Sequence, residues 1–185
     1  MKIKLYFELT DNLTGNLPLP RVTIKLNDII LDKDVELDNP NNETTLWQTD
    51  KKISVKEYSV EIDDDVEQEY TITITKTSNF ALPGPDDYGA YVKDIEIHDI
   101  SIESLIWSTG LVTAELCPES EFETNGFITY VKENSPETFD QVLIIDGKCV
   151  WKSHTNFLNF NMDHNEYSFN FSTPIYIWLL ESLLQ

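Results

Sequence analysis

The chain has 185 residues, of which 41% are hydrophobic, so it can fold as a single domain, residues 1–185, around a sizeable core. Its 33 acidic residues exceed its 13 basic ones by 20, and a surface with this negative charge repels nucleic acid and anionic lipid. These values argue against a disordered chain and against nucleic acid or membrane as a partner, and they leave cation binding, a basic partner surface or simple solubility open.

The cysteines and the N-terminus indicate where the protein is made. Two cysteines, Cys117 and Cys149, are too few for a disulfide framework. Cys149 alternates with Trp151 in a strand pattern, so we expect it to be buried and reduced. Met1–Leu5 has the pattern of a strand and lacks the apolar stretch of a signal peptide. The longest apolar run, Ile175–Leu180, is far shorter than the roughly 20 residues of a membrane span. We expect a protein made in the cytosol without a membrane anchor.

The first half of the chain alternates apolar and polar residues as strands do. Tyr70–Thr75 is the clearest case, with strict period two and residues that favour strands. Asn27-Asp28 separates two apolar runs as the turn of a hairpin would, and Asp63–Asp65 interrupts the pattern. The predicted elements are the strand Lys2–Leu9, the hairpin Val22–Leu37, and the strands Trp47–Thr49, Ile53–Ile62 and Tyr70–Thr75.

The second half contains two more hairpins of the same format. Their two-residue turns are His98-Asp99 and Asp146-Gly147, residue types that tolerate the positive φ of a tight hairpin turn. Asp163–Glu166 predicts a fourth hairpin turn. The predicted elements are the hairpin Ile95–Ile102, the strands Leu111–Leu116 and Phe127–Lys132, the hairpin Leu143–Trp151, and the paired strands Phe157–Met162 and Tyr167–Phe171.

Ten or eleven short strands at this spacing predict an all-β fold, an antiparallel β-sandwich or jelly roll with a short apolar C-terminal segment. The C-terminal residues from Pro174 are apolar on every side, so they form either a last strand that closes the sandwich or a docking segment, residues 174–185. Aromatic residues are enriched at interfaces. The candidate partner-binding residues are Tyr176, Trp178, Leu179 and Leu183.

The sequence shows no catalytic motif. It has no Gly-x-Ser-x-Gly elbow and no glycine-rich phosphate loop, and its three histidines do not have the spacing of zinc ligands. Pairs of carboxylates are abundant, but they fall mostly in turns and on outward strand positions rather than in one predicted cleft. We therefore expect a protein that is not an enzyme, with no catalytic residue.

Acidic turns offer a calcium site, because Ca²⁺ takes six to eight oxygen ligands, often from irregular loops. No EF-hand spacing occurs, and acidic turns of this kind can equally be solvated surface. The candidate ligands are Asp63, Asp64, Asp65, Asp86 and Asp87, with Asp32, Asp34 and Asp38 as a looser set.

Four tryptophans raise the question of carbohydrate binding, since sugars stack on aromatic faces. Trp47 lies near a polar loop and is the best exposed candidate, whereas Trp151 lies on a hairpin strand and is expected in the core.

Three segments resemble a group of small β-sandwich proteins from tailed phages, especially phages of marine bacteria and cyanobacteria. In that group a strand precedes an acidic loop, an alternating strand and a tight turn follow, and the domain can end in an aromatic-Pro-aromatic-Trp-Leu-Leu segment. The order of strand, loop and hairpin is also similar to that of calcium-dependent carbohydrate-binding modules. The segments are Tyr70–Ile74, Ala90–Ile102 and Phe169–Glu181.

The resemblance covers the middle and last parts of the chain and implies a structural protein of the phage virion: a tail, baseplate, fibre or capsid-surface component. Such a protein would act in assembly or host attachment, in multiple copies in a symmetric particle assembled in the host cytoplasm. Its partners would be other virion proteins and, at the host surface, polysaccharide. The alternative is a calcium-dependent carbohydrate-binding module. The chain departs from the group at His98-Asp99, where a glycine turn is more frequent, and its calcium ligand pattern is incomplete.

Overall fold

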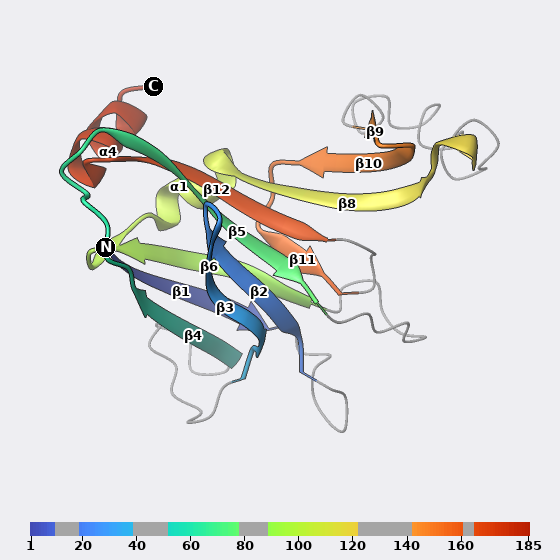
Figure 1. Cartoon of the computed structure of the whole chain (residues 1–185), viewed down its shortest axis with the longest axis horizontal. Helices are drawn as coiled ribbons and strands as arrows, with labels where there is room; N and C mark the ends of the chain where they lie inside the picture. The colour runs from blue at the N-terminus through green and yellow to red at the C-terminus, as the bar shows by residue number, and fades with distance from the viewer. Residues whose placement is uncertain (10–18, 39–51, 78–88, 122–141, 161–164) are drawn as a thin grey trace.

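The structure is a computed structural model that describes residues 1–9, 19–38, 52–77, 89–121, 142–160 and 165–185. In these ranges the chain is mostly β, with two antiparallel sheets and a C-terminal helix (Figure 1). The strands are β1 (Lys2–Leu9), β2 (Arg21–Leu26), β3 (Ile29–Glu36), β4 (Lys52–Ser59), β5 (Gln68–Lys76), β6 (Gly89–Ile97), β7 (Ile100–Ser101), β8 (Gly110–Pro118), β9 (Val142–Ile145), β10 (Lys148–Ser153), β11 (Phe157–Asn159) and β12 (Glu166–Thr173). The helices are α1 (Glu103–Thr109), a 3-10 turn (Glu119–Glu121) and α4 (Ile175–Leu183).

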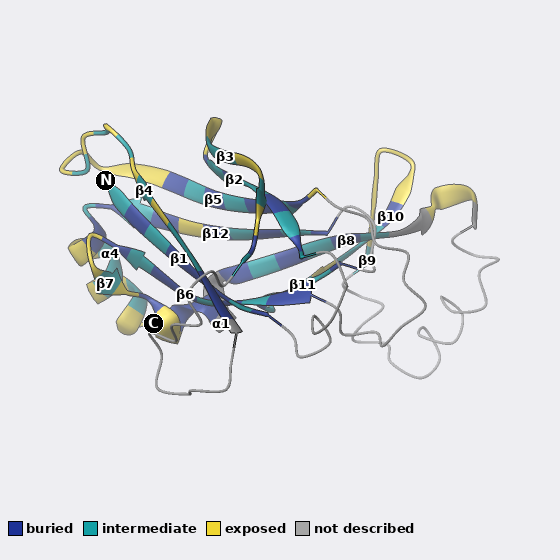
Figure 2. Ribbon diagram, turned by 90° about the horizontal axis from the view of Figure 1, so that it is seen from below, coloured by how far each residue is buried: buried dark blue, intermediate teal, exposed yellow. Residues whose placement is uncertain are grey.

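One sheet has the strand order β11-β6-β1-β4, with β7 added on β6, and the other has the order β3-β2-β5-β12-β8-β10-β9. Figure 2 shows the two sheets as two layers seen from the side. The expected all-β sandwich is therefore confirmed.

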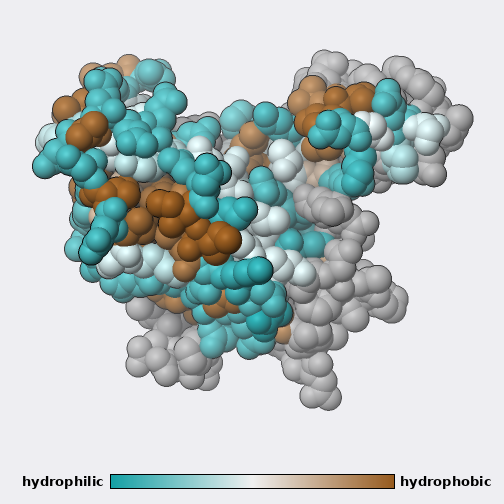
Figure 3. Space-filling view, in the orientation of Figure 1, coloured by the Kyte–Doolittle hydropathy of each residue, from teal (hydrophilic) through white to brown (hydrophobic). Residues whose placement is uncertain are grey.

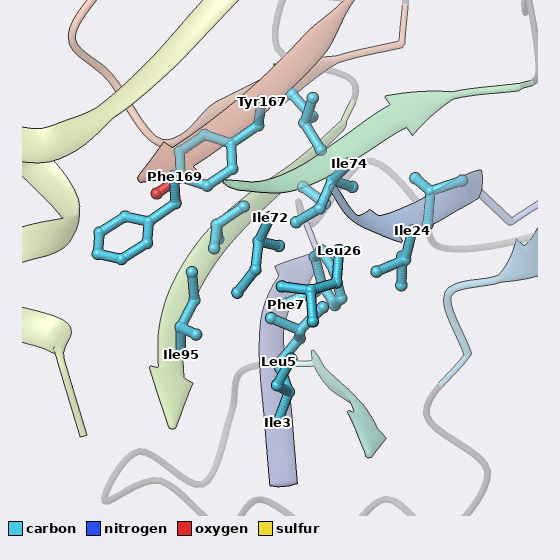
Figure 4. Packing of buried hydrophobic residues seen from close by; sticks show 14 of the residues in the cluster. Ile3, Leu5, Phe7, Ile24, Leu26, Ile72, Ile74, Ile95, Tyr167 and Phe169 are labelled. Carbon is cyan, nitrogen blue, oxygen red and sulfur yellow. The ribbon is translucent and has the colours of Figure 1, made fainter. Parts of the chain in front are cut away.

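The core fills the space between the sheets because alternate side chains of each strand point inward. Figure 4 shows side chains from β1, β2, β5, β6 and β12 converging there. Each large aliphatic or aromatic side chain that is fully buried contributes about 1.5–3 kcal/mol to stability. The labelled members are Ile3, Leu5, Phe7, Ile24, Leu26, Ile72, Ile74, Ile95, Tyr167 and Phe169, all of them fully buried.

All three predicted hairpins are present, and their turns differ in backbone geometry. His98 and Asp99 have φ of 52° and 62°, and Asp146 and Gly147 have φ of 50° and 75°. Both turns thus carry two residues in the left-handed region, as a type I′ turn requires. In the Asn27-Asp28 turn of the first hairpin, only Asn27, with φ of 50°, is in that region.

The fourth predicted hairpin is wrong. β11 pairs with β6 in one sheet, while β12 pairs with β5 and β8 in the other, so the chain crosses between the sheets at this point. The turn-forming composition of residues 163–166 marks a reversal of direction but cannot say whether the two flanking strands share a sheet.

The remaining differences concern the ends of elements. The helix α1 was not predicted, and the strand expected over Ile53–Ile62 ends at Ser59. The C-terminal segment is a helix and not a closing strand. The strands expected at Trp47–Thr49 and Phe127–Lys132 lie outside the described residues.

Candidate docking surface

The strands β5 and β12 extend beyond their neighbours as a two-stranded ribbon. The last β8 residue that pairs with β12 is Gly110, opposite Phe169, whereas β12 and β5 stay paired out to Thr173 and Gln68. On the other side, Asn27 ends the β2 contact: its amide oxygen accepts the N–H of Thr71 at 2.8 Å. We call residues Gln68–Thr71 and Asn170–Thr173 the ribbon.

Hydrogen bonds fix both ends of the ribbon. The Thr71 hydroxyl donates to the side-chain oxygen of Asn170 at 2.7 Å. The hydroxyl of Thr173, a buried residue, donates to the carbonyl of Val66 at 2.7 Å and lies 3.2 Å from the carbonyl of Gln68. These bonds hold the segment before β5 against the point where β12 ends and α4 begins.

The helix α4 is anchored to the core by its aromatic side. Ile175 is buried, and the Trp178 ring meets Phe169 and Phe171 edge-on, with centroids 5.9 and 6.4 Å apart. Phe171 in turn stacks on Tyr70, with centroids 5.6 Å apart. Edge-on and offset-stacked rings are the favourable arrangements for aromatic pairs, so this cluster fixes the position of the helix.

The opposite side of α4 is apolar and exposed. Positions i, i+4 and i+7 share a helix face, and Tyr176, Leu180 and Leu183 have this spacing. Tyr176 is 66% exposed and Leu183 is 67% exposed, and Ile177, Leu180 and Leu184 are also exposed. Apart from Glu181 and Ser182, every residue of α4 is apolar, and a helix of this composition is normally buried. The outer side of α4 is therefore the candidate docking surface.

A groove runs between α4 and the ribbon. Its volume is about 600 Å³, and its apolar wall is formed by Pro174, Ile177 and Trp178. A second hollow of about 390 Å³, which shares Glu69, Ser172 and Trp178 with the first, extends it over the ribbon. The other residues that line the groove are polar or acidic: Glu67, Gln68, Glu69, Ser172, Thr173 and Glu181.

Two further groups of exposed aliphatic residues lie outside α4. Ile29 and Ile30 are exposed at the tip of the β2–β3 hairpin, and Leu143, Ile144 and Ile145 are exposed on β9, at the edge of its sheet. Figure 3 shows hydrophobic residues around this hairpin tip and, at the upper right, over β9 and β10.

Of the four predicted partner-binding residues, the structure places two outward and two inward. Tyr176 and Leu183 are on the exposed side of α4, whereas Trp178 and Leu179 are partly buried against the core. The prediction missed the exposed hairpin tip and β9. The signal was present in the sequence, because runs of adjacent aliphatic residues place apolar side chains on both faces of a strand.

The acidic turn Asp63–Asp65 is engaged by hydrogen bonds and cationic groups. Asp64 pairs with His98 and lies 3.8 Å from the N-terminal amine, and a side-chain oxygen of Asp63 accepts the N–H of Asp65 at 3.2 Å. In the part of the chain that the structure describes, no three His, Cys, Asp or Glu side chains lie close enough to hold a metal ion. The calcium site stays a prediction, since Asp86 and Asp87 lie outside the described residues.

The predicted carbohydrate residue, Trp47, also lies outside the described residues. Trp151 and Trp178 are half-buried and pack against the core, so neither presents a free face as a platform. For Trp151 this agrees with the expected core position, and sugar binding stays a prediction.

Burial raises the pKa of several groups in the body of the sandwich, among them Asp94 and Tyr167. Asp94 is buried, and burial raises the pKa of its carboxyl even though its oxygens accept hydrogen bonds from the Ser101 hydroxyl and the Ile95 N–H, both at 2.7 Å. Burial also raises the pKa of the Tyr167 phenol, whose oxygen has no hydrogen-bond partner among the described residues. Neither residue lines the groove, so both belong to the scaffold.

No model of a known protein family, no curated protein and no solved structure matches the chain. None of the helices in the described ranges has the length and apolar character needed to span a membrane. The case for a function therefore depends on the surfaces described above.

Proposed function

We propose that this chain is a non-enzymatic structural protein that joins a larger protein assembly through the outer side of α4. The observation that carries this proposal is the row of exposed Tyr176, Leu180 and Leu183 on a helix whose other side is fixed to the core. Burying such side chains against a partner is favourable by about 25 cal/mol for each Å² of apolar surface removed from water.

The kind of assembly follows from the resemblance of three segments to β-sandwich proteins of tailed phages. We propose a virion component of the tail, baseplate, fibre or capsid surface, present in multiple copies. A sandwich held in position by an apolar helix suits that role, because the packed core makes the body a stable support and the helix supplies an attachment point. A net charge of −20 keeps free copies from associating with one another.

The test is incorporation into particles. In washed particles of the encoding phage, the chain should occur in a fixed ratio to the major capsid protein, measured by quantitative mass spectrometry. Absence of the chain from washed particles would overturn the proposal.

The role of α4 is tested by the triple variant Tyr176→Ser, Leu180→Ser, Leu183→Ser, which changes only exposed positions. It should fold, as judged by circular dichroism, and should fail to enter particles. The matched control is Ile29→Ser with Ile30→Ser at the hairpin tip, which removes comparable exposed side chains elsewhere and should enter normally. Normal entry of the helix variant would show that α4 does not attach the protein.

A further inference from the structure

The groove between α4 and the ribbon carries an unusual combination of charge and apolar surface. Glu67, Glu69 and Glu181 line it, and none of the described residues that line either hollow is a lysine, arginine or histidine. Among the described residues, none of these three glutamates forms an ion pair. The carboxylates therefore stand uncompensated beside the apolar wall of Ile177 and Trp178.

Some acidic groups elsewhere on the described surface lie next to a cation of the chain. Arg21 pairs with Asp34 at 3.0 Å, and Lys2 pairs with Asp99 at 3.0 Å. The groove is thus a place where negative potential and apolar surface coincide, and the described part of the chain places no cation in it. Complementary charge across an interface steers the partner and sets its register.

We propose that the groove binds a segment of a partner protein in which a large apolar side chain is flanked by arginine or lysine. The apolar side chain packs against Ile177 and Trp178, and the flanking cations face Glu67, Glu69 and Glu181. Arginine suits this site best, because its planar group forms paired hydrogen bonds with a carboxylate. This inference rests on the proposed function and names the chemistry of the partner.

The arrangement favours a peptide over the other ligands that carboxylates attract. A single metal ion needs its ligands gathered at one point, and no three acidic groups in the described part of the chain come that close. A sugar needs a free aromatic face, but the Trp178 ring is half-buried against Phe169 and Phe171. A second copy of the chain would bring 33 acidic residues against 13 basic ones. Separated carboxylates along an apolar wall match separated cations along a peptide.

The experiment measures fluorescence anisotropy of a labelled peptide, Gly-Arg-Lys-Leu-Trp-Arg-Arg-Gly, with the full chain. The groove variant is Glu67→Gln, Glu69→Gln, Glu181→Gln, and the control variant is Glu57→Gln, Glu103→Gln, Glu119→Gln, which removes the same charge at exposed positions elsewhere. We expect the groove variant to bind about 10-fold more weakly than the native chain and the control variant to bind nearly as tightly. A peptide with serines in place of Leu-Trp should bind weakly to all three proteins.

Three outcomes would overturn the inference: no binding to the native chain at about 1 mM peptide, equal losses in the two variants, or equal binding of the serine peptide. Equal losses would show attraction by overall charge alone. Failure here leaves the proposed function standing if the variant of the outer side of α4 is still excluded from particles, because that variant keeps all three glutamates. If the variant of the outer side of α4 enters particles normally and the groove variant binds the peptide as tightly as the native chain does, both proposals fall.

Discussion

Two regions next to the larger sheet, α4 and the β8-β10-β9 side, both expose aliphatic side chains, but they are attached to the body in different ways. The helix α4 packs on Phe169 and Phe171 of β12 through Trp178. The strands β8, β10 and β9 run out beyond the smaller sheet, as Figure 1 shows. We call Ala114–Pro118 of β8, together with β9 and β10, the arm.

Among the described residues, the arm is held mainly by backbone pairing. β8 pairs with β12 only up to Thr113 and beyond that point pairs with β10 alone. Ala114 and Cys149 are buried in the arm but lie outside the main core cluster, which the arm reaches through Trp151. Among the described residues, exposed apolar surface therefore occurs in two settings: on α4 it lies on a helix packed on the core, whereas on β9 it lies on an edge strand, the kind of strand that pairs with other strands.

The largest expected effect is on the anchor of α4. Trp178→Ala should lower the free energy of unfolding by about 2–3 kcal/mol, because it removes a large side chain that is partly buried against two aromatic rings. The control Leu180→Ala, on the exposed side of the same helix, should change it by less than about 0.5 kcal/mol. Urea titration followed by circular dichroism measures both.

If the two substitutions had equal effects, α4 would not be anchored through Trp178, and the difference drawn between the two regions would be lost. A large effect of both would mean that the outer side of α4 also packs on the body. Either result would redirect the docking proposal from the helix to another surface.

The next effect concerns the arm, where we expect a small change in the free energy of unfolding and a larger change in self-association. Leu143→Lys with Ile145→Lys should change the free energy of unfolding by less than about 1 kcal/mol, because both side chains are exposed on an edge strand. Charges on an edge strand oppose pairing with other strands, so the variant should aggregate less at high concentration, as measured by light scattering. A destabilisation as large as that of Trp178→Ala would show that the arm is part of the core.

From the sequence, the individual strands and turns could be predicted better than the pairing of the strands within the sheets. Strict alternation in Tyr70–Thr75 and the turn residues at His98-Asp99 and Asp146-Gly147 specify strands and turns through neighbouring residues alone. Which sheet β11 and β12 join is decided by long-range packing, so the predicted fourth hairpin was wrong. The helix α4 could not be told from a strand because a short run that is apolar on all sides has no clear period.

The docking surface could be predicted only in part, because the apolar C-terminal run has no clear period. The composition of the C-terminal segment indicated an interface, but the division into an anchored side and an exposed side needs the helical period, which shows Tyr176 and Leu183 outward and Trp178 inward. The groove was not predictable, because Glu67 and Glu181 are far apart in the sequence. They line the same groove only because β5 pairs with β12, the strand that leads into α4.

The smallest effect is on pH dependence, and it concerns the body rather than the arm. Burial raises the pKa of Asp94, so the folded chain holds the proton at a higher pH than the unfolded chain does. The contribution of Asp94 is therefore fully present below the ordinary carboxyl pKa and is lost as pH rises through the raised value. Asp94→Asn stays neutral throughout, so its stability relative to the native chain should increase from acid to neutral pH, as urea titrations at a series of pH values would show.

Asp34 provides the control with the opposite sign. A hydrogen bond from the Thr77 hydroxyl, and next the guanidinium of Arg21, lower the pKa of Asp34, so its contribution is present above the ordinary carboxyl pKa and is lost as pH falls. Asp34→Asn should thus be less stable than the native chain at neutral pH, by an amount that shrinks towards acid pH. The two variants make the same change in charge. If their relative stabilities change with pH in opposite directions, the effect at Asp94 comes from its burial in the body. Parallel trends in the two variants would instead mean that both effects come from the change in the net charge of the chain.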